Sequence, residues 1–67
     1  MAITLKAARV NAGYTQETAG IKIGVSKDTI SAWERNLSTP NSRYIPMIEK
    51  VYQVSYNDLI FLPKNNA

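Results

Sequence analysis

The stretch from Gln16 to Asn36 constrains the fold of this chain more than any other, because it predicts two short helices joined by a tight turn. Thr15 precedes the first helix and is a suitable N-cap. Gly24 can end that helix in the left-handed conformation, and Ser26 is a suitable N-cap for the second. We therefore expect helices over about 16–23 and 27–35.

The second helix of this pair has a narrow apolar face and a polar outer face. Ile30 and Trp33 lie three residues apart, so they share the face that packs inward. The residues left on the outer face are small, polar or charged: Lys27, Asp28, Ser31, Ala32 and Arg35. An anchored helix with mixed donors and acceptors outside suits the major groove of DNA.

Composition excludes several kinds of site. The 67 residues include no cysteine and no histidine, so disulfides, thiolate metal sites and the usual general base are excluded. The five carboxylates are scattered, and the three glycines stand singly, so they form no phosphate-binding glycine loop. We expect no enzyme activity, no cofactor, no metal and no small-molecule substrate. The net charge of +3 gives weak support for a nucleic-acid partner.

Hydropathy indicates a cytoplasmic protein that does not associate with a membrane, and DNA binding would place it at the nucleoid. No apolar run approaches the roughly 20 residues that cross a bilayer. Lys6 and Arg9 interrupt the apolar stretch that a signal peptide would need. The length predicts a single domain over 1–67, and it leaves open both a complete protein and a fragment of a longer one.

The rest of the chain predicts three more helices and no strand. Thr4 can cap a helix over about 5–12 that Gly13 ends, and Pro46 suits the start of a helix over about 45–52. Ser55 can cap a last helix over about 56–61, before a frayed tail at 64–67. The prediction is an all-α bundle of five short helices, with a core of Leu5, Ala8, Ala19, Ile23, Val25, Ile30, Trp33, Ile48, Val51 and Leu59.

The chain resembles the phage repressor family of helix-turn-helix proteins (Cro/C1-type, or XRE). The resemblance rests on the order Gln16, Ala19, Gly24, Val25, Ser26, Ile30, Trp33, Glu34. The segment YIPMIEKVYQVSYNDL is similar to the last two helices of that family. The resemblance implies a lambda-repressor-like fold that binds double-stranded DNA and regulates transcription. It also implies a repressor that binds a two-fold-symmetric operator as a homodimer.

Base contacts are expected from the third helix and the residue before it. The candidates are Ser26, Lys27, Asp28, Thr29, Ser31 and Ala32. Lys27 can donate to guanine, serine can bond to either kind of base edge, and Ala32 can contact a thymine methyl group. Asp28 can accept from cytosine, cap the helix or pair with Lys27. The alternative is that these residues form an ordinary solvated helix face.

Contacts with the DNA backbone follow from the resemblance. It assigns them to Gln16, at the start of the second helix, and to Arg35, Asn36, Asn41, Ser42, Arg43 and Tyr44. A helix N-terminus can hold a phosphate through its free N–H groups, and such contacts set register without selecting sequence. The alternative for Gln16 is an ordinary first-turn residue, and for Arg43 it is a solvated charge.

The resemblance also implies a structural ion pair between Arg9 and Glu34, which joins the first helix to the third. Residues toward the C-terminus are candidates for the dimer surface: Tyr52, Tyr56, Phe61 and Leu62. The helical spacing also places Tyr52 on the inward face of the fourth helix, with Ile48 and Val51. The rival function is a protein-interaction module, antitoxin-like or bound by a protein antagonist, that uses its C-terminal helices.

Overall fold

The computed structural model describes residues 2–60 and contains four α-helices. They are α1 (Leu5–Asn11), α2 (Gln16–Ile23), α3 (Lys27–Glu34) and α4 (Ile45–Tyr52). Two 3₁₀ turns, η1 (Ser42–Tyr44) and η2 (Tyr56–Asp58), precede α4 and the last strand. The two short strands are β1 (Ile3–Thr4) and β2 (Leu59–Ile60). The four predicted α-helices are confirmed to within about one residue at their ends.

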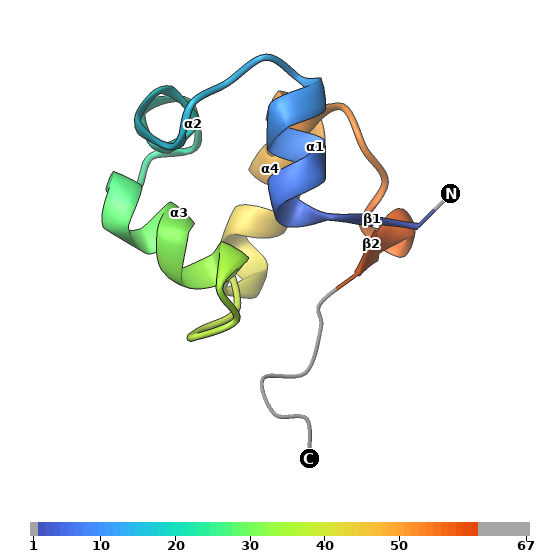
Figure 1. Cartoon of the computed structure of the whole chain (residues 1–67). Coiled ribbons are helices and arrows are strands. Elements are labelled where there is room, and N and C mark those ends of the chain that lie inside the picture. Colours follow the sequence, from blue (N-terminus) through green and yellow to red (C-terminus); the bar gives the residue numbers. More distant parts are fainter. Residues whose placement is uncertain (1, 61–67) are drawn as a thin grey trace.

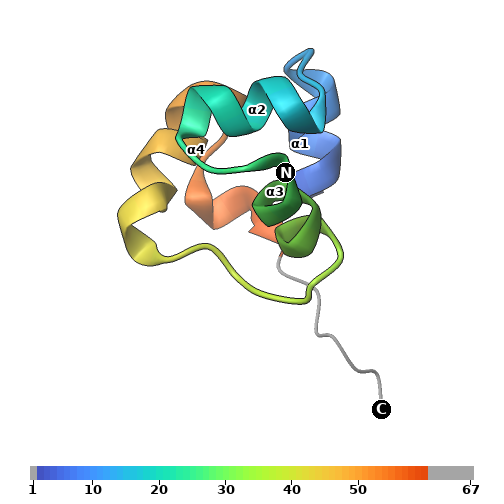
Figure 2. The ribbon, with the colours of Figure 1, turned by 90° about the vertical axis from the view of Figure 1, so that its left-hand side faces the viewer.

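The helices surround one apolar core. α2 and α3 pack together on one side of α1, while α4 closes the core behind it (Figure 1). Turned by 90°, α2 is seen from the side and α3 nearly along its axis, so the two helices cross steeply (Figure 2). This arrangement leaves the outer side of α3 facing away from the body of the molecule.

Local capping signals in the sequence determine where the helices begin. The side-chain oxygens of Thr4, Thr15 and Ser26 accept hydrogen bonds from the backbone N–H three residues later. Each of these bonds satisfies one of the N–H groups that a helix start leaves without an intrahelical partner. Thr15 and Thr18 complete a reciprocal capping box.

Helix ends also follow the sequence signals. Gly13 and Gly24 have φ of 88° and 100°, a region that glycine enters without steric penalty. Asn36 follows α3 with φ of 61°, a left-handed conformation that asparagine tolerates better than most residues. Gln53 ends α4 in the same way, with φ of 57°. Pro46 is at the start of α4, where its missing N–H costs no hydrogen bond.

The core agrees with the prediction at most positions. Its buried apolar residues are Leu5, Ala8, Ala19, Ile23, Ile30, Trp33, Ile48, Tyr52 and Leu59. Val25 and Val51 are partly buried and pack against this cluster. Ile21, in contrast, is 72% exposed on the outer side of α2.

The predicted last helix over 56–61 is wrong, and so is the expectation of no strand. Residues 56–58 form one 3₁₀ turn, after which Leu59 and Ile60 pair in parallel with Ile3 and Thr4. A six-residue helix nucleates poorly, and asparagine and aspartate favour turns over helix interiors. In the strand, the backbone of Leu59 and Ile60 pairs with β1, and the Leu59 side chain is buried in the core. Phe61, Leu62, Pro63 and the predicted tail lie outside the described residues.

The dimer role predicted for Tyr52 is contradicted by its position. Its side chain is 4% exposed and belongs to the core, so it contributes no surface for a second copy. Burial is the main reason that the pKa of Tyr52 is raised to about 12, and the nearby negative charge of Glu34 adds to the shift. Tyr52 is therefore a neutral core residue at physiological pH.

Candidate nucleic-acid interface

α3 is anchored by its inner face and its two ends. Ile30 is 1% exposed and Trp33 is 6% exposed, so both predicted anchors are in the core. At the N-terminal end the Ser26 hydroxyl accepts from the Thr29 N–H at 3.2 Å and lies 3.0 Å from the Thr29 hydroxyl. Ile30 and Trp33 hold this eight-residue helix against the core, while the Ser26 bonds stabilise its first turn.

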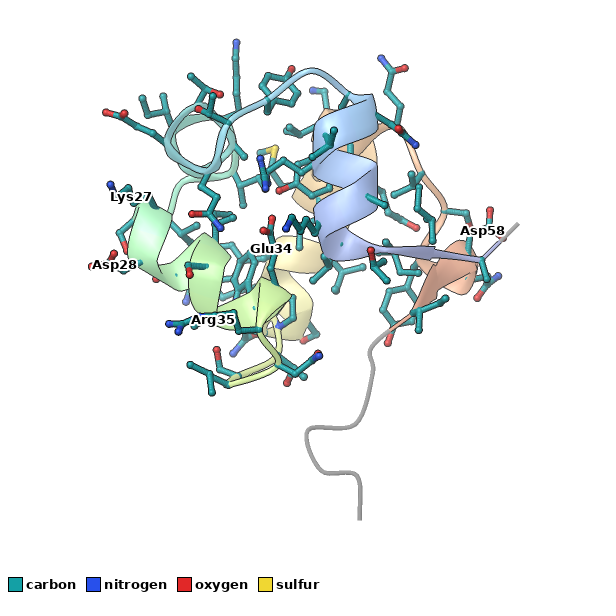
Figure 3. All side chains as sticks on the ribbon, in the orientation of Figure 1. Lys27, Asp28, Glu34, Arg35 and Asp58 are labelled. Carbon is teal, nitrogen blue, oxygen red and sulfur yellow. The ribbon has the colours of Figure 1, made fainter. Side chains whose placement is uncertain are left out.

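The outer side of α3 carries the predicted base-contact residues. Ser26, Lys27 and Asp28 are exposed, while Thr29, Ser31 and Ala32 are partly exposed. Lys27, Asp28 and Arg35 point outward, whereas Glu34 points toward α1 (Figure 3). The fold thus brings the six candidates onto one accessible end and side of a single helix.

The geometry narrows the alternatives for Asp28. Ser26, and not Asp28, caps α3, and within residues 2–60 Asp28 forms no ion pair with Lys27. Asp28 is in the first turn, where a negative charge is favoured by the helix dipole. A stabilising role at the helix start and a hydrogen bond accepted from cytosine both remain compatible with this position.

A buried ion pair connects α1 to the C-terminal end of α3. Arg9 Nε lies 2.6 Å from Glu34 Oε2, and Arg9 Nη2 donates to Glu34 Oε1 at 3.2 Å. The two side chains are only 10% and 5% exposed. The hydrogen bond to Glu34 raises the pKa of the Arg9 guanidinium, although burial lowers it. This pair is the one that the resemblance implied.

Two further groups complete the hydrogen bonding of this pair. Arg9 Nη1 donates to the carbonyl of Tyr14 at 2.9 Å, and Gln16 Nε2 donates to Glu34 Oε1 at 3.1 Å. α1, the start of α2 and the end of α3 therefore meet at one carboxylate. Gln16 is partly exposed and has a second N–H on the same nitrogen, so bracing Glu34 leaves a donor for a phosphate.

The predicted backbone contacts are distributed around α3. Arg35, Asn41, Ser42 and Arg43 are exposed, while Asn36 and Tyr44 are partly buried. Asn41 Oδ1 accepts from the Arg43 N–H at 3.0 Å and so caps η1. The sequence analysis did not predict this 3₁₀ turn or its cap. The available signal was Asn41 itself, because an asparagine side chain in a loop often accepts from the backbone N–H two residues later.

Gly20 is a structural residue that the sequence analysis missed. It is buried in α2, and a Cβ built on it would lie 2.5 Å from the carbonyl oxygen of Val25. Its own carbonyl accepts from the N–H groups of Gly24 and Val25 at 2.7 Å and 2.9 Å. The absence of a side chain lets the turn before α3 pack directly on α2. An isolated glycine inside a helical pattern was the available signal.

Comparison with known proteins identifies the family of this arrangement. The model of the family described as "Helix-turn-helix" matches residues 5–59, which span α1 to the first residue of β2. The chain belongs to the Cro/C1-type (XRE) helix-turn-helix family. In this XRE chain α2 and α3 are the helix-turn-helix, with α3 as the second helix of the motif.

A curated relative supports the same assignment. The chain is 34% identical over 56 residues to the HTH-type transcriptional regulator ImmR of Bacillus subtilis (strain 168). The match covers 84% of this XRE chain and 44% of ImmR, so the chain spans less than half the length of this relative. No solved structure matches the chain significantly.

Two other kinds of feature are absent from the described part of this XRE chain. Within residues 2–60, no helix combines the length and the apolar character needed to cross a membrane. In the same residues, no three acidic side chains are grouped so that they could hold a metal ion.

Proposed function

We propose that this chain binds double-stranded DNA in a sequence-dependent way and regulates transcription, with α3 in the major groove. The observation that carries the proposal is the construction of α3. Its inner face is fixed by Ile30, Trp33 and the Glu34 carboxylate, while Lys27 and its neighbours are accessible outside. A rigidly held helix with free donors and acceptors can discriminate base pairs in that groove.

We further propose that the functional species is a homodimer that acts as a repressor on a two-fold-symmetric operator. One helix of this length contacts only a few base pairs, and a second copy doubles the site. Repression follows if the bound dimer blocks access of RNA polymerase to a promoter that overlaps the operator.

The proposed dimer surface is a groove of about 620 Å³ at the start of α4. This surface keeps Tyr56 from the predicted dimer residues and leaves out the buried Tyr52. It is lined by Thr39, Pro40, Ser42, Ile45, Pro46 and Tyr56. Tyr56 is 48% exposed, and Met47 beside the groove in sequence is 40% exposed. Ser42 is also a predicted backbone contact, so a second copy in this groove would lie next to the DNA.

The same groove supports the rival function, a protein-interaction module. An apolar concave surface can equally accept a segment of an antagonist or of another regulator. The DNA proposal is favoured because it also uses the exposed residues of α3, which lie on another part of the molecule.

The experiment that tests the proposed function is binding to mixed-sequence duplex DNA over a salt series, followed by selection of bound sequences. We expect affinity to fall steeply with salt and a two-fold-symmetric site to be enriched. Salt-sensitive binding without an enriched site would contradict sequence-dependent regulation. Absence of binding to any duplex would contradict the DNA proposal and favour the protein-interaction module.

A further inference from the structure

Three side chains form a continuous stack from the core to the predicted DNA backbone contact Arg43. The rings of Trp33 and Tyr44 have centroids 5.8 Å apart and are tilted by 51°. The Arg43 guanidinium carbon lies 5.2 Å from the centroid of the Tyr44 ring. Trp33 is a buried residue of α3, whereas Arg43 is exposed in η1. The stack therefore connects the recognition helix to a cation on a separate element.

Both ends of Arg43 have a partner: the Tyr44 ring lies under its guanidinium, and hydrogen bonds to Asn41 hold its backbone. Asn41 Oδ1 accepts from the Arg43 N–H at 3.0 Å, and the Asn41 carbonyl accepts from the Tyr44 N–H at 2.9 Å. These bonds close the 3₁₀ turn that places Tyr44 at the N-cap of α4. A long exposed arginine is ordinarily free to adopt many rotamers, and here both of its ends have a partner.

We propose that Tyr44 is a positioning residue: its ring, held by Trp33, sets the place of the Arg43 guanidinium relative to α3. This inference rests on the proposed function and changes the role expected for Tyr44 from a direct phosphate contact to a support for one. The position of Arg43 then determines the register in which α3 meets the bases, because backbone contacts orient the protein on the duplex.

The physical basis is preorganisation. A cation over the face of an aromatic ring is attracted by the ring quadrupole, and guanidinium also stacks on such faces. Ordering Arg43 before binding removes part of the entropic cost of ordering it on the DNA. The ring carries this effect, so the hydroxyl of Tyr44 is dispensable for it.

The test measures the affinity of the full chain for mixed-sequence duplex over a salt series, with four variants. They are Arg43→Ala, Tyr44→Phe, Tyr44→Leu and the double variant Arg43→Ala/Tyr44→Leu. Arg43→Ala removes one phosphate contact. It should weaken binding by roughly fivefold to tenfold near 0.1 M salt and reduce the slope of log affinity against log salt concentration by about one. Tyr44→Leu, which keeps the charge, should weaken binding by about threefold.

The pattern across the variants distinguishes positioning from direct contact. We expect Tyr44→Phe to bind like the unmodified chain and the double variant to bind no worse than Arg43→Ala. Additive losses in the double variant would overturn the inference. So would unchanged binding by Tyr44→Leu, or equal losses for Tyr44→Phe and Tyr44→Leu, which would make the hydroxyl a direct contact.

Two further outcomes have their own readout: a Tyr44→Leu variant that does not fold, and an unmodified chain that binds no DNA. If Tyr44→Leu does not fold, the δ protons of Arg43 in the unmodified chain are measured by NMR. An upfield ring-current shift supports the stack, and random-coil positions overturn it. If the unmodified chain binds no DNA, the proposed function itself fails, whereas binding that is insensitive to Tyr44→Leu removes only this inference.

Discussion

At the residue scale, Glu34 is the side chain on which most of the structure near α3 depends. Its carboxylate accepts hydrogen bonds from Arg9 and Gln16, and Glu34 directly follows the buried Trp33 in the sequence. The pairing of Arg9 with Glu34 was predicted from the family resemblance, because no local pattern in the sequence indicates it. The participation of Gln16 and the Tyr14 carbonyl depends on how three helices meet, which no local signal specifies.

Replacing Glu34 with alanine is expected to destabilise the fold strongly, because Arg9 would keep a buried charge without its partner. Breaking a buried pair in this way costs about 3–5 kcal/mol. The measurement is urea unfolding, with Glu17→Ala, an exposed position, as the control that should change stability by less than about 1 kcal/mol. The double variant Arg9→Met/Glu34→Leu should recover most of the loss, and a still larger loss would contradict this account.

The raised pKa of Tyr52 predicts that the free energy of unfolding falls at alkaline pH. Its pKa is raised to about 12 in the folded state, above the value of about 10 for an unperturbed tyrosine. Its contribution is therefore constant below pH 10 and decreases between pH 10 and 12, by about 1.4 kcal/mol for each unit crossed. From pH 10 to 12 the unmodified chain should therefore lose stability relative to Tyr52→Phe, since phenylalanine does not ionise. Unfolding free energies of both proteins measure the difference. A constant difference would show that Tyr52 ionises equally in both states.

At the element scale, local signals predicted the helices well and the C-terminal segment poorly. Thr4, Thr15 and Ser26 cap their helices through bonds within the same turn, so sequence alone contains the information. The strand at Leu59 depends on Ile3, more than fifty residues away in sequence. Such pairing is non-local, and a Ser-x-x-Asp pattern is compatible with a helix until that partner is known.

The capping box of α2 gives a test at this scale. Replacing Thr15 with alanine removes the acceptor for the Thr18 N–H and should lower the unfolding free energy by about 1 kcal/mol. The control is Ser38→Ala in the exposed loop after α3, which should have little effect. Chemical denaturation of both variants measures the difference. Equal stabilities would show that the cap contributes nothing net.

At the scale of the whole molecule, the proposed DNA face and the proposed dimer groove lie on different elements but meet near Ser42. The groove is lined by the loop after α3, the start of α4 and η2, while α3 carries the proposed base contacts. The sequence predicted the inward and outward faces of α3, because an amphipathic pattern is local. The same kind of pattern placed Tyr52 on the inward face of the fourth helix, and the packing of α4 shows that Tyr52 is in the core and not on a dimer surface.

The groove predicts how the oligomeric state responds to substitution. Replacing Tyr56 with lysine places a charge in the proposed interface and should shift the chain toward monomer in sedimentation velocity, with and without selected operator DNA. Gln53→Lys, an exposed change of the same charge on the end of α4, is the control. A chain that is monomeric at all concentrations, also on DNA, would contradict the dimer proposal.

The central claim is that the outer side of α3 selects the DNA sequence, and Lys27 tests it most directly. Base preference on the selected site is measured for Lys27→Ala and for Lys50→Ala, which removes an equal charge from the exposed side of α4. We predict that Lys27→Ala relaxes preference at particular base pairs by about 1–3 kcal/mol, while Lys50→Ala leaves the preference intact. A Lys27→Ala variant that weakens all sequences alike, with preference unchanged, would contradict the claim.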